Sequence, residues 1–418
     1  MPDAVTASWW KNLGSDELNR LVGQAATGSF DVAAAAARVA QARAQSRIAG
    51  AALLPAVTGF ADADRQSGLL VSNADSNDTG FDLGIAASYE LDFWGRNRSL
   101  RDASVARLNA SVFDRDTVAL TVMSDVASMW LQTVALRERG SVARRTLATA
   151  QRILAAIDSQ RRAGAATALE LAQQRGLVAA RKRTAAALEQ QANDAEASLA
   201  LLLGETPSRF HVATTSLDDL RVPLIDAGVP SSLITRRPDL ASAEAQLRAA
   251  HADITVARAA MLPSVTLSGS VGLGSERLRS LFDNPVYSVA AGLTAPIFNA
   301  GSLAAGRDLA VARQEELLAV YRKAIVAAFG DVELSLNAAA GVDAQRIAQN
   351  EELAQARRAL VLAESRYRAG AETLLVVLDA QQTLYAAEDE AMQLRLARLQ
   401  ASVALFRALG GGWSEATG

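Results

Sequence analysis

The stretch FDLGIAASYELDFWGR, residues 81–96, alternates between apolar and polar side chains. Its odd-numbered positions up to 93 are phenylalanine, leucine, isoleucine, alanine or tyrosine, whereas the even-numbered positions up to 92 are small, acidic or hydroxylated. Such alternation is typical of a β-strand that turns one face to an apolar environment. Similar or weaker alternation recurs elsewhere, and the pattern predicts four strands, at 55–66, 80–94, 263–275 and 286–298.

Long helices are predicted in the tracts that follow these strands. No proline occurs between Pro55 and Pro207 or after Pro296, and because proline within a helix costs ~3 kcal/mol, these tracts permit uninterrupted helices. A helix over residues 96–163 would be ~100 Å long at 1.5 Å per residue, which no compact globule requires. The expected helices cover about 31–53, 96–163, 168–203, about 239–261, 302–369 and 373–409.

The chain repeats itself at a nearly constant offset. ALLPAVTGF at 52–60 matches AMLPSVTLS at 260–268, an offset of 208 residues. The other two matches, both offset by 206 residues, are RDASVAR at 101–107 with RDLAVAR at 307–313, and RRAGAAT at 161–167 with YRAGAET at 367–373. Matches that stay in register over this distance indicate an internal duplication.

Each half of the duplication is therefore expected to have the same plan. That plan is a helix ending at a proline, two strands, a very long helix, a glycine-containing turn and a second helix. The first repeat is expected at 1–204, and the second, with its C-terminal tail, at 238–418. The proline-rich segment 205–237 is expected to link them. Gly204 and Gly410 follow the last helix of each repeat, a common place for glycine.

The composition argues against catalysis and nucleic-acid binding. The 418 residues carry a net charge of −3 and include no cysteine, so no nucleic-acid partner is expected and thiolate metal sites are excluded. The two histidines, His211 and His251, lack a metal-ligand spacing. No zinc-protease, serine-hydrolase or phosphate-loop motif occurs. We therefore expect no enzymatic activity, no cofactor and no metal site.

The strand pattern favours a membrane barrel, although a small antiparallel sheet over a soluble core is an alternative. Each predicted strand can supply the ~9–11 residues that cross an outer membrane, and aromatic residues lie near the strand ends, where interfacial girdles form. These aromatic residues are Tyr89, Phe93, Trp94, Tyr287 and Phe298. No apolar run approaches the ~18 residues expected of a membrane-spanning helix.

Four strands are too few to close a barrel, because the smallest membrane barrels have ~8 strands. Open sheet edges are costly in lipid, since their backbone groups find no hydrogen-bond partners there. Three chains would supply twelve strands, so the sequence favours a homotrimer. The long helices of such a trimer would stand side by side and continue the pore as a helical barrel.

Five stretches together resemble the TolC-like outer-membrane efflux proteins, especially the lipoprotein branch that serves tripartite (RND-type) drug-efflux systems. They are YELDFWGR (89–96), RRPDLASAEAQLRAA (236–250), ARAAMLPSVTLSGSVG (257–272), YRAGAETLLVVLDAQQTLYAAE (367–388) and LFRALGGGW (405–413). The resemblance extends from Trp9 to Trp413. It implies an α+β membrane protein whose trimer forms a twelve-stranded outer-membrane β-barrel and a helical periplasmic α-barrel.

The resemblance implies a passive exit duct for drugs or other small molecules, located in the outer membrane and extending into the periplasm. The implied partners are a periplasmic adaptor (membrane fusion protein), a proton-driven inner-membrane pump and outer-membrane lipid. Members of the lipoprotein branch begin with a lipid-bearing cysteine after a signal peptide. The first ten residues here, MPDAVTASWW, show neither feature, so we expect a trimmed or misplaced start.

A periplasmic gate is also implied by the resemblance. Asp379 matches the constricting aspartate of the family, and Leu375 matches a leucine one turn before it. Both are expected to face the pore, where three copies would form an apolar plug and a negative ring. The equivalent position in the first repeat is Gln173, so the two repeats differ at the gate.

Two further groups of residues are candidates for function. The glycine-containing turns are expected to dock the helical hairpin of the adaptor. Their candidate residues are Arg162, Gly164, Ala165, Thr167, Arg368, Gly370, Ala371 and Thr373. In the second predicted strand, Asp82, Glu90 and Asp92 lie at the polar positions of the alternating pattern and are expected to face the barrel lumen. Acidic side chains there predict that the channel has a weak preference for cations.

Two other functions stay open at this point. An outer-membrane channel of a type I protein secretion system would have the same fold and would differ in its partner. A soluble periplasmic coiled-coil scaffold is the second alternative. The sequence does not specify the substrate, the particular pump and adaptor, or whether the gate is open or closed.

Overall fold

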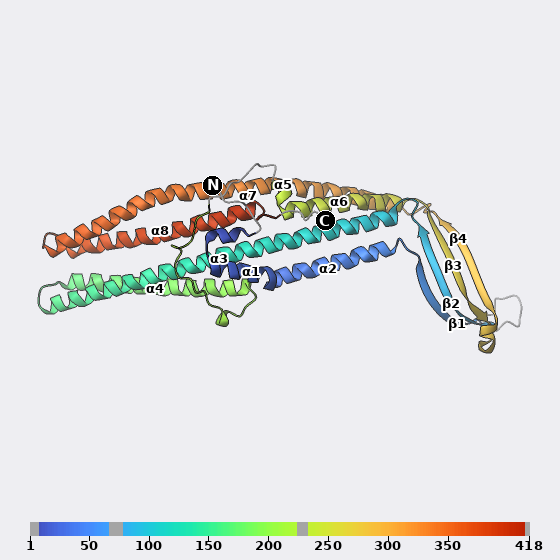
Figure 1. Ribbon diagram of the computed structural model, residues 1–418, viewed down its shortest axis with the longest axis horizontal. Helices are drawn as coiled ribbons and strands as arrows, with labels where there is room; N and C mark the ends of the chain where they lie inside the picture. The colour runs from blue at the N-terminus through green and yellow to red at the C-terminus, as the bar shows by residue number, and fades with distance from the viewer. Residues whose placement is uncertain (1–7, 67–77, 224–232, 414–418) are drawn as a thin grey trace. The chain divides into compact units, whose positions relative to one another are not determined.

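The structure is a computed structural model that describes residues 8–66, 78–223 and 233–413 (Figure 1). Its main elements are α1 (Asp16–Gly28), α2 (Phe30–Ala51), β1 (Ala56–Gln66), β2 (Asp78–Leu91), α3 (Arg96–Arg162), α4 (Ala168–Leu202), α5 (Leu233–Arg236), α6 (Pro238–Ala259), β3 (Ser264–Ser275), β4 (Pro285–Thr294), α7 (Ser302–Arg368) and α8 (Leu374–Ala408). Short 3-10 helices are η1 (Trp9–Leu13), η2 (Pro207–Arg209) and η4 (Leu278–Asp283).

The chain forms two compact units. The first consists of Met1–Ala36, Asp114–Leu240 and Ala324–Gly418, and the second of Ala37–Phe113 and Ala241–Lys323. Each unit therefore takes residues from both halves of the sequence. The first unit is helical, whereas the second contains the whole sheet.

The long helices match the predicted ones closely, and their bounds follow the offset of the sequence matches. α3 and α7 each have 67 residues. α4 and α8 each have 35 residues. Alanine-rich, proline-free sequence favours such helices because alanine has the highest intrinsic helix propensity. The long helices of the two halves thus have equal lengths.

β2 and β4 end earlier than the sequence pattern predicts. β2 ends at Leu91, and the carboxylate of the next residue, Asp92, accepts hydrogen bonds from the backbone N–H groups of Asn97 at 3.0 Å and Arg98 at 2.9 Å. β4 ends at Thr294 rather than at 298. Pro296 lies in that missing segment, and proline has no N–H with which to extend a strand ladder.

Helix α1 is an element that the sequence pattern did not predict. It begins after Ser15, whose hydroxyl accepts a hydrogen bond of 3.2 Å from the backbone N–H of Leu18. Its buried side chains, Leu18, Leu21, Val22 and Ala25, follow helical spacing. The capping serine and this spacing were visible in the sequence and could have identified the helix.

Two helices contain a stretch apolar enough to cross a membrane by length and composition. The best 18-residue windows have mean hydropathy 1.3 in α3 and 1.4 in α7. These windows do not contradict the prediction that no uninterrupted apolar run of this length exists, because a window of high mean hydropathy tolerates an occasional charge whereas such a run does not. Half of the α3 window is buried, but only 17% of the α7 window, so α7 keeps an apolar surface exposed.

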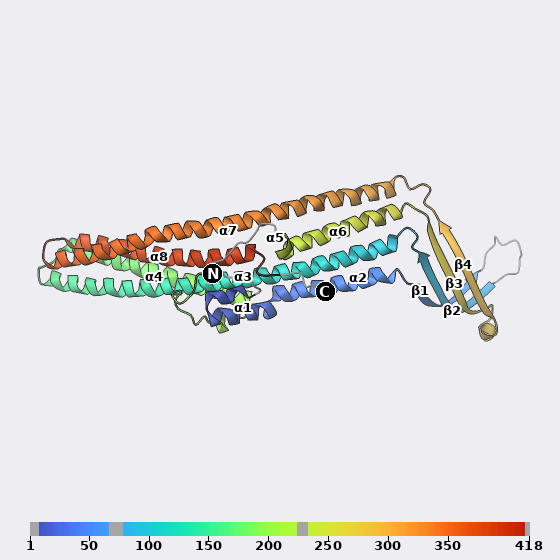
Figure 2. The same ribbon diagram turned by 45° about the horizontal axis from the view of Figure 1, so that its top comes forward.

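The sheet of the second unit has the order β1-β2-β3-β4, and every neighbouring pair is antiparallel (Figure 2). One face is apolar and exposed: Ile85, Val271, Tyr287, Val289 and Leu293 all have more than half of their surface accessible. All ten residues of β4 are exposed. An apolar face left open in this way needs an apolar environment, and the described residues of the second unit do not cover it.

The main core of the first unit joins the two ends of the described chain to the long helices. The indole of Trp9 stacks on the ring of Phe406 in α8, with centroids 5.1 Å apart. Trp130 of α3 is fully buried in the same cluster, with Leu199 of α4 and Leu217 of the inter-repeat segment. Burial of each large apolar side chain stabilises the fold by about 1.5–3 kcal/mol.

Three glutamates of the first unit hold the inter-repeat segment through its backbone. They come from α1, α3 and α4, and each accepts hydrogen bonds from backbone N–H groups that have no strand partner. Glu17 binds Ala213 at 2.7 Å and Thr214 at 3.0 Å, Glu138 binds Leu217 at 2.9 Å, and Glu196 binds Val212 at 2.8 Å. Buried polar backbone groups must be paired, so carboxylates here take the place of a β-ladder.

The ionisation of Glu17 is coupled to the fold. Burial raises the pKa of its carboxyl, but the hydrogen bonds from Thr214, Ala213 and Trp130 together lower the pKa below its ordinary value of 4.5. The charged form is therefore favoured in the folded state. Its stabilising effect is present above the ordinary pKa and is lost as the pH falls through the lower, folded pKa.

We expect Glu17→Gln to lower stability most at neutral pH. The urea-denaturation midpoints of the variant and the unchanged protein should differ above pH 4.5 and converge as the pH falls below it, because protonation removes the same charge. The control is Glu189→Gln, at an exposed glutamate of α4. A difference that is independent of pH would show that the carboxylate charge does not stabilise the segment.

Candidate functional site

The two helical hairpins of the first unit end in turns of the same backbone geometry. In the turn between α3 and α4, Gly164 has φ +77° and its N–H binds the carbonyl of Arg161 at 3.0 Å. In the turn between α7 and α8, Gly370 has φ +74° and binds the carbonyl of Tyr367 at 2.9 Å. The left-handed conformation at this position is costly for most residue types and easiest for glycine, which explains both glycines.

The residues after the glycines complete the same helix-ending motif. The N–H of Ala165 donates to the carbonyl of Gln160 at 2.8 Å, and the N–H of Ala371 donates to the carbonyl of Arg366 at 2.9 Å. These bonds satisfy carbonyl groups that a helix end leaves unpaired. Neither glycine has a heavy atom near the position of an added Cβ atom, so both turns present open backbone surface.

The two turns differ in how the following helix begins. Thr167 forms a capping box with Glu170: its hydroxyl accepts from Glu170 N at 3.2 Å, and Glu170 Oε2 accepts from Thr167 N at 2.7 Å. These hydrogen bonds lower the pKa of the Glu170 carboxyl. Thr373 occupies the matching position, but its side chain makes no capping hydrogen bond. The α7–α8 turn is therefore less firmly held.

The arginines of the turns are exposed and paired along their own helices. Arg162 binds Asp158 at 2.7 Å, and Arg368 binds Glu364 at 3.0 Å; each acid lies one helical turn earlier. Both arginine side chains are 77% exposed. Exposed pairs of this kind contribute about 0.3–0.5 kcal/mol, so the guanidinium groups can exchange their partner for an acid on another protein.

A small apolar cluster packs the two hairpins together next to the turns. It is formed by the buried side chains of Ile157, Leu171, Leu374 and Leu378. On α8, Leu374 and Leu378 are buried, whereas the residue that follows each of them, Leu375 and Asp379, is exposed. Because they are four residues apart, Leu375 and Asp379 share one face of the helix, about 100° around the helix axis from the buried pair. Leu375 is 59% exposed and Asp379 is exposed. The structure thus places both predicted gate residues together on one accessible surface.

The matching surface in the first repeat differs by one charge. Leu169 of α4 stands at the repeat position of Leu375 and is also exposed. Gln173 stands at the position of Asp379 and is half-buried. Leu169 was not singled out from the sequence, although the constant offset of 206 residues would have identified it.

The three predicted lumen acids lie in the second unit and have different surroundings. Asp82 is exposed in β2 and lies opposite Asp62 of β1. Glu90 pairs with Arg96 at 3.1 Å. Asp92 lies beyond the end of β2 and binds the start of α3, so strand alternation does not determine its direction. The three carboxylates therefore do not form one cluster.

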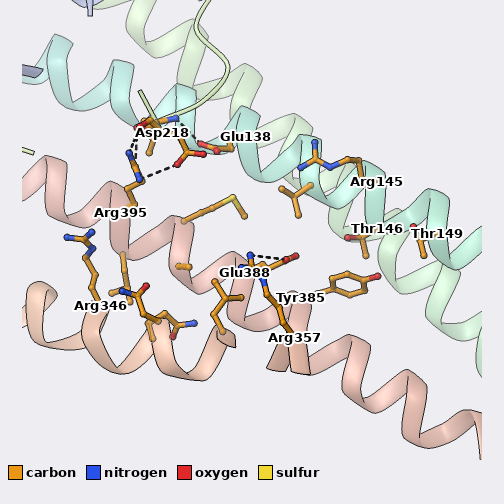
Figure 3. Close-up of a pocket in the computed structure, with 18 residues that line it drawn as sticks. Glu138, Arg145, Thr146, Thr149, Asp218, Arg346, Arg357, Tyr385, Glu388 and Arg395 are labelled. Carbon is orange, nitrogen blue, oxygen red and sulfur yellow. Dashed lines mark hydrogen bonds and ion pairs between the residues drawn. The ribbon is translucent and has the colours of Figure 1, made fainter. Parts of the chain in front are cut away.

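Two cavities of the first unit lie beside α8. One, of about 490 Å³, is drawn in Figure 3. Its arginines are largely engaged within the chain: Arg395 binds the carbonyls of Leu217 at 3.0 Å and Asp218 at 2.8 Å, and Arg357 lies 3.7 Å from Glu388. The charges of this cavity are therefore mainly used in contacts within the chain. The other cavity, of about 610 Å³, is lined by residues of α3, α4 and α8.

Comparisons with known proteins define the class and then the family. The chain is 51% identical over 415 residues to the pyoverdine export outer membrane protein OpmQ of Pseudomonas aeruginosa, covering 97% of this chain and 88% of that protein. A membrane protein from Pseudomonas aeruginosa has a TM-score of 0.91 at 33% identity, with 96% and 94% of the two chains covered. The open MtrE outer membrane channel of Neisseria gonorrhoeae has a TM-score of 0.88 at 31% identity, with 99% and 94% covered.

The fold is that of an outer-membrane channel. The model of the family "Outer membrane efflux protein" matches residues 21–205 and 229–411, and the chain belongs to this family. The predicted fold class is confirmed: four strands per protomer form part of a trimeric twelve-stranded β-barrel, and the long helices form a periplasmic α-barrel. The predicted efflux function and outer-membrane location are confirmed too.

We expect Thr167→Ala to loosen the start of α4 and Thr373→Ala to have little effect on α8. Loss of a capping side chain costs about 1 kcal/mol, which corresponds to roughly five-fold faster opening of the first helical turn. Hydrogen–deuterium exchange of the first-turn amides, followed by mass spectrometry, measures this difference. Equal acceleration in both variants would contradict the asymmetry between the turns.

Proposed function

We propose that the chain is the gated exit duct of a tripartite pump that exports small molecules. The observation that carries this proposal is the exposed pair Leu375 and Asp379 on α8, which lies beside the turns and on a different face of the helix from the buried Leu374 and Leu378. In a trimer this face supplies three leucines and three carboxylates to one opening. The leucines exclude water and the carboxylates repel each other, so the constriction closes weakly and opens under a modest force.

Small molecules are the proposed cargo. Two relatives that are 50% and 51% identical to this chain are named as pyoverdine export proteins. Other relatives are named for cation, solvent or toluene efflux. We propose that this chain conducts a secreted small molecule of the pyoverdine kind, passively and without catalysis, because its family is one of channels.

The proposed partners are a periplasmic adaptor, a proton-driven inner-membrane pump and outer-membrane lipid. The turns suit an adaptor because they combine open backbone at Gly164 and Gly370 with exposed arginines. The sheet suits lipid because the apolar side chains of β4 are open, with Tyr287 83% and Val289 86% exposed. Asp82 and Glu90 remain the proposed acids of the barrel lumen.

Replacement of the gate pair tests the duct. Leu375→Ala with Asp379→Ala should raise the single-channel conductance of the trimer in planar lipid bilayers, because the apolar plug and the charged ring are both removed. Leu362→Ala, at an exposed leucine of α7, is the control and should leave conductance unchanged. Unaltered conductance in the double variant would exclude this pair from the gate.

A substitution at the α7–α8 turn tests adaptor docking. Gly370→Trp places a large side chain in open space and should reduce small-molecule export by cells that contain the cognate adaptor and pump. Gly370→Asn is the matched control, since asparagine tolerates the left-handed conformation and adds little bulk. Trimer yield should be the same for both. Reduced yield in the tryptophan variant would assign a folding role to the turn instead.

A further inference from the structure

The cavity of about 610 Å³ in the first unit, which we call the arginine recess, is lined by more arginines than acids. Residues of α3, α4 and α8 form its walls. Its polar lining includes Arg139, Arg181, Arg183, Gln382, Tyr385 and Asp389. Three guanidinium groups therefore face one carboxylate among the described residues that line it.

The carboxylate of the recess is already neutralised. Asp389 receives a bidentate ion pair from Arg139, with Nε to Oδ1 at 2.6 Å and Nη2 to Oδ2 at 2.9 Å. The side-chain amide of Gln393 adds a third hydrogen bond at 2.8 Å. A bidentate arginine–carboxylate pair is among the strongest hydrogen-bonded arrangements available to side chains. Asp389 therefore has little capacity left for the other two arginines.

Arg181 has an incomplete set of partners. Its guanidinium lies 5.0 Å from the ring centroid of Tyr385. Its Nε atom is buried and has no hydrogen-bond partner among the described residues. A cation–π contact contributes about 0.5–2 kcal/mol, but a buried donor without an acceptor costs about 1–3 kcal/mol. An acceptor that entered the recess would remove that cost.

The phenol of Tyr385, which contacts this arginine, is expected to stay protonated and therefore neutral. Burial raises the pKa of its phenol, and the positive charge of Arg181 opposes that effect less strongly. Figure 3 shows Tyr385 directed from α8 toward Thr146 and Thr149 of α3. The ring thus forms a wall that the recess shares with the neighbouring cavity.

Arg183 is the second cation without a counter-charge. It lines the recess, is exposed, and makes no ion pair within the described part of the chain. Arg183 of α4 also stands at the repeat position of Asp389 of α8. The duplicated position therefore has opposite charges in the two halves, and only the acidic copy is neutralised inside the protein.

Beside the polar side chains of Thr146, Thr184 and Gln191, the recess also has apolar walls. Val142, Leu188, Ala187 and Met392 contribute them. Guanidinium groups bind carboxylates in a planar, two-pronged geometry, and an apolar wall accommodates the carbon skeleton that bears the carboxylate. The lining is therefore complementary to an organic anion and not to a bare inorganic ion.

The recess lies on the same face of α8 as the proposed gate. Leu375, Asp379, Gln382 and Ala386 are spaced by four, three and four residues, which places them along one side of a helix. All four are exposed, and the last two line the recess. If the proposed function is correct in directing Leu375 and Asp379 to the pore, the recess opens into the duct beyond the gate.

We propose that the arginine recess is a binding site for carboxylate-bearing organic anions that pass through the duct. Arg181 and Arg183 bind the carboxylate, and the apolar wall contacts the carbon skeleton. In the trimer, three recesses give a positively charged zone that follows the negative ring at Asp379. The site favours anionic cargo after the gate, where the negative ring alone would repel it.

Binding of phthalate, an aromatic dicarboxylate, tests the proposal directly. Equilibrium dialysis of radiolabelled phthalate against the purified trimer in detergent at low salt measures binding without requiring conduction. The double variant Arg181→Gln with Arg183→Gln should bind about ten-fold more weakly, a loss expected when charge-assisted hydrogen bonds are removed. Phthalamide, the uncharged analogue, should not bind detectably to either protein.

Lys182 supplies the matched control. It lies between the two arginines on α4, is exposed, and does not line the recess. Lys182→Gln removes one positive charge and should change phthalate affinity less than about two-fold, because exposed charges outside contact range are screened. Equal weakening by Lys182→Gln, or no binding by the unchanged trimer at about 10 mM phthalate, a very weak Kd, would overturn the proposal.

A current measurement separates this proposal from the proposed function. Phthalate should reduce single-channel current through the unchanged trimer but not through the double arginine variant. If phthalate binding depends on both arginines but phthalate does not change the current, the binding site exists but does not lie in the duct. If the channels conduct normally but phthalate binding does not depend on either arginine, the proposed duct function stands and the proposed binding site is excluded.

Discussion

The edges of the β-sheet impose the constraint on which the assembly depends. β1 and β4 are the outer strands of a four-stranded antiparallel sheet, and each has one strand neighbour in the described chain. In a lipid layer an unpaired backbone N–H or C=O group costs several kcal/mol, since no water is present to bind it. A ten-residue edge such as β4 could not persist there alone. Pairing with identical copies removes both edges, and the trimer of the family is the result.

The apolar face of the same sheet makes this constraint stricter. Tyr287, Val289 and Leu293 are open along β4, and such a surface is unfavourable in water. The sheet therefore needs lipid for its face and other chains for its edges at the same time. Neither requirement can be met by the monomer, so membrane insertion and oligomerisation are coupled by the physics of one small sheet.

Duplication provided the protein with two nearly identical frames that could then diverge in charge. The paired helices have equal lengths, and the glycines of both hairpin turns adopt the same left-handed geometry. The differences are local: Gln173 stands at the repeat position of Asp379, and Arg183 stands at that of Asp389. If the proposals for the gate and the recess are correct, both sites lie at positions where the two repeats carry different residues. A solute in the duct would then pass a negatively charged zone and after it a positively charged one.

The sequence by itself determined the strands, the long helices, the duplication and the need for more than one chain. Periodicity and proline placement are local signals, and they suffice where the backbone follows intrinsic preference. Local signals missed the end of β2, because Asp92 leaves the strand to bind the first amides of α3. They also missed the carboxylates that hold the inter-repeat segment, and the contacts of Arg139 with Asp389 and of Arg181 with Tyr385. These partners lie far apart in the chain, and only tertiary packing brings their charges and rings within contact distance.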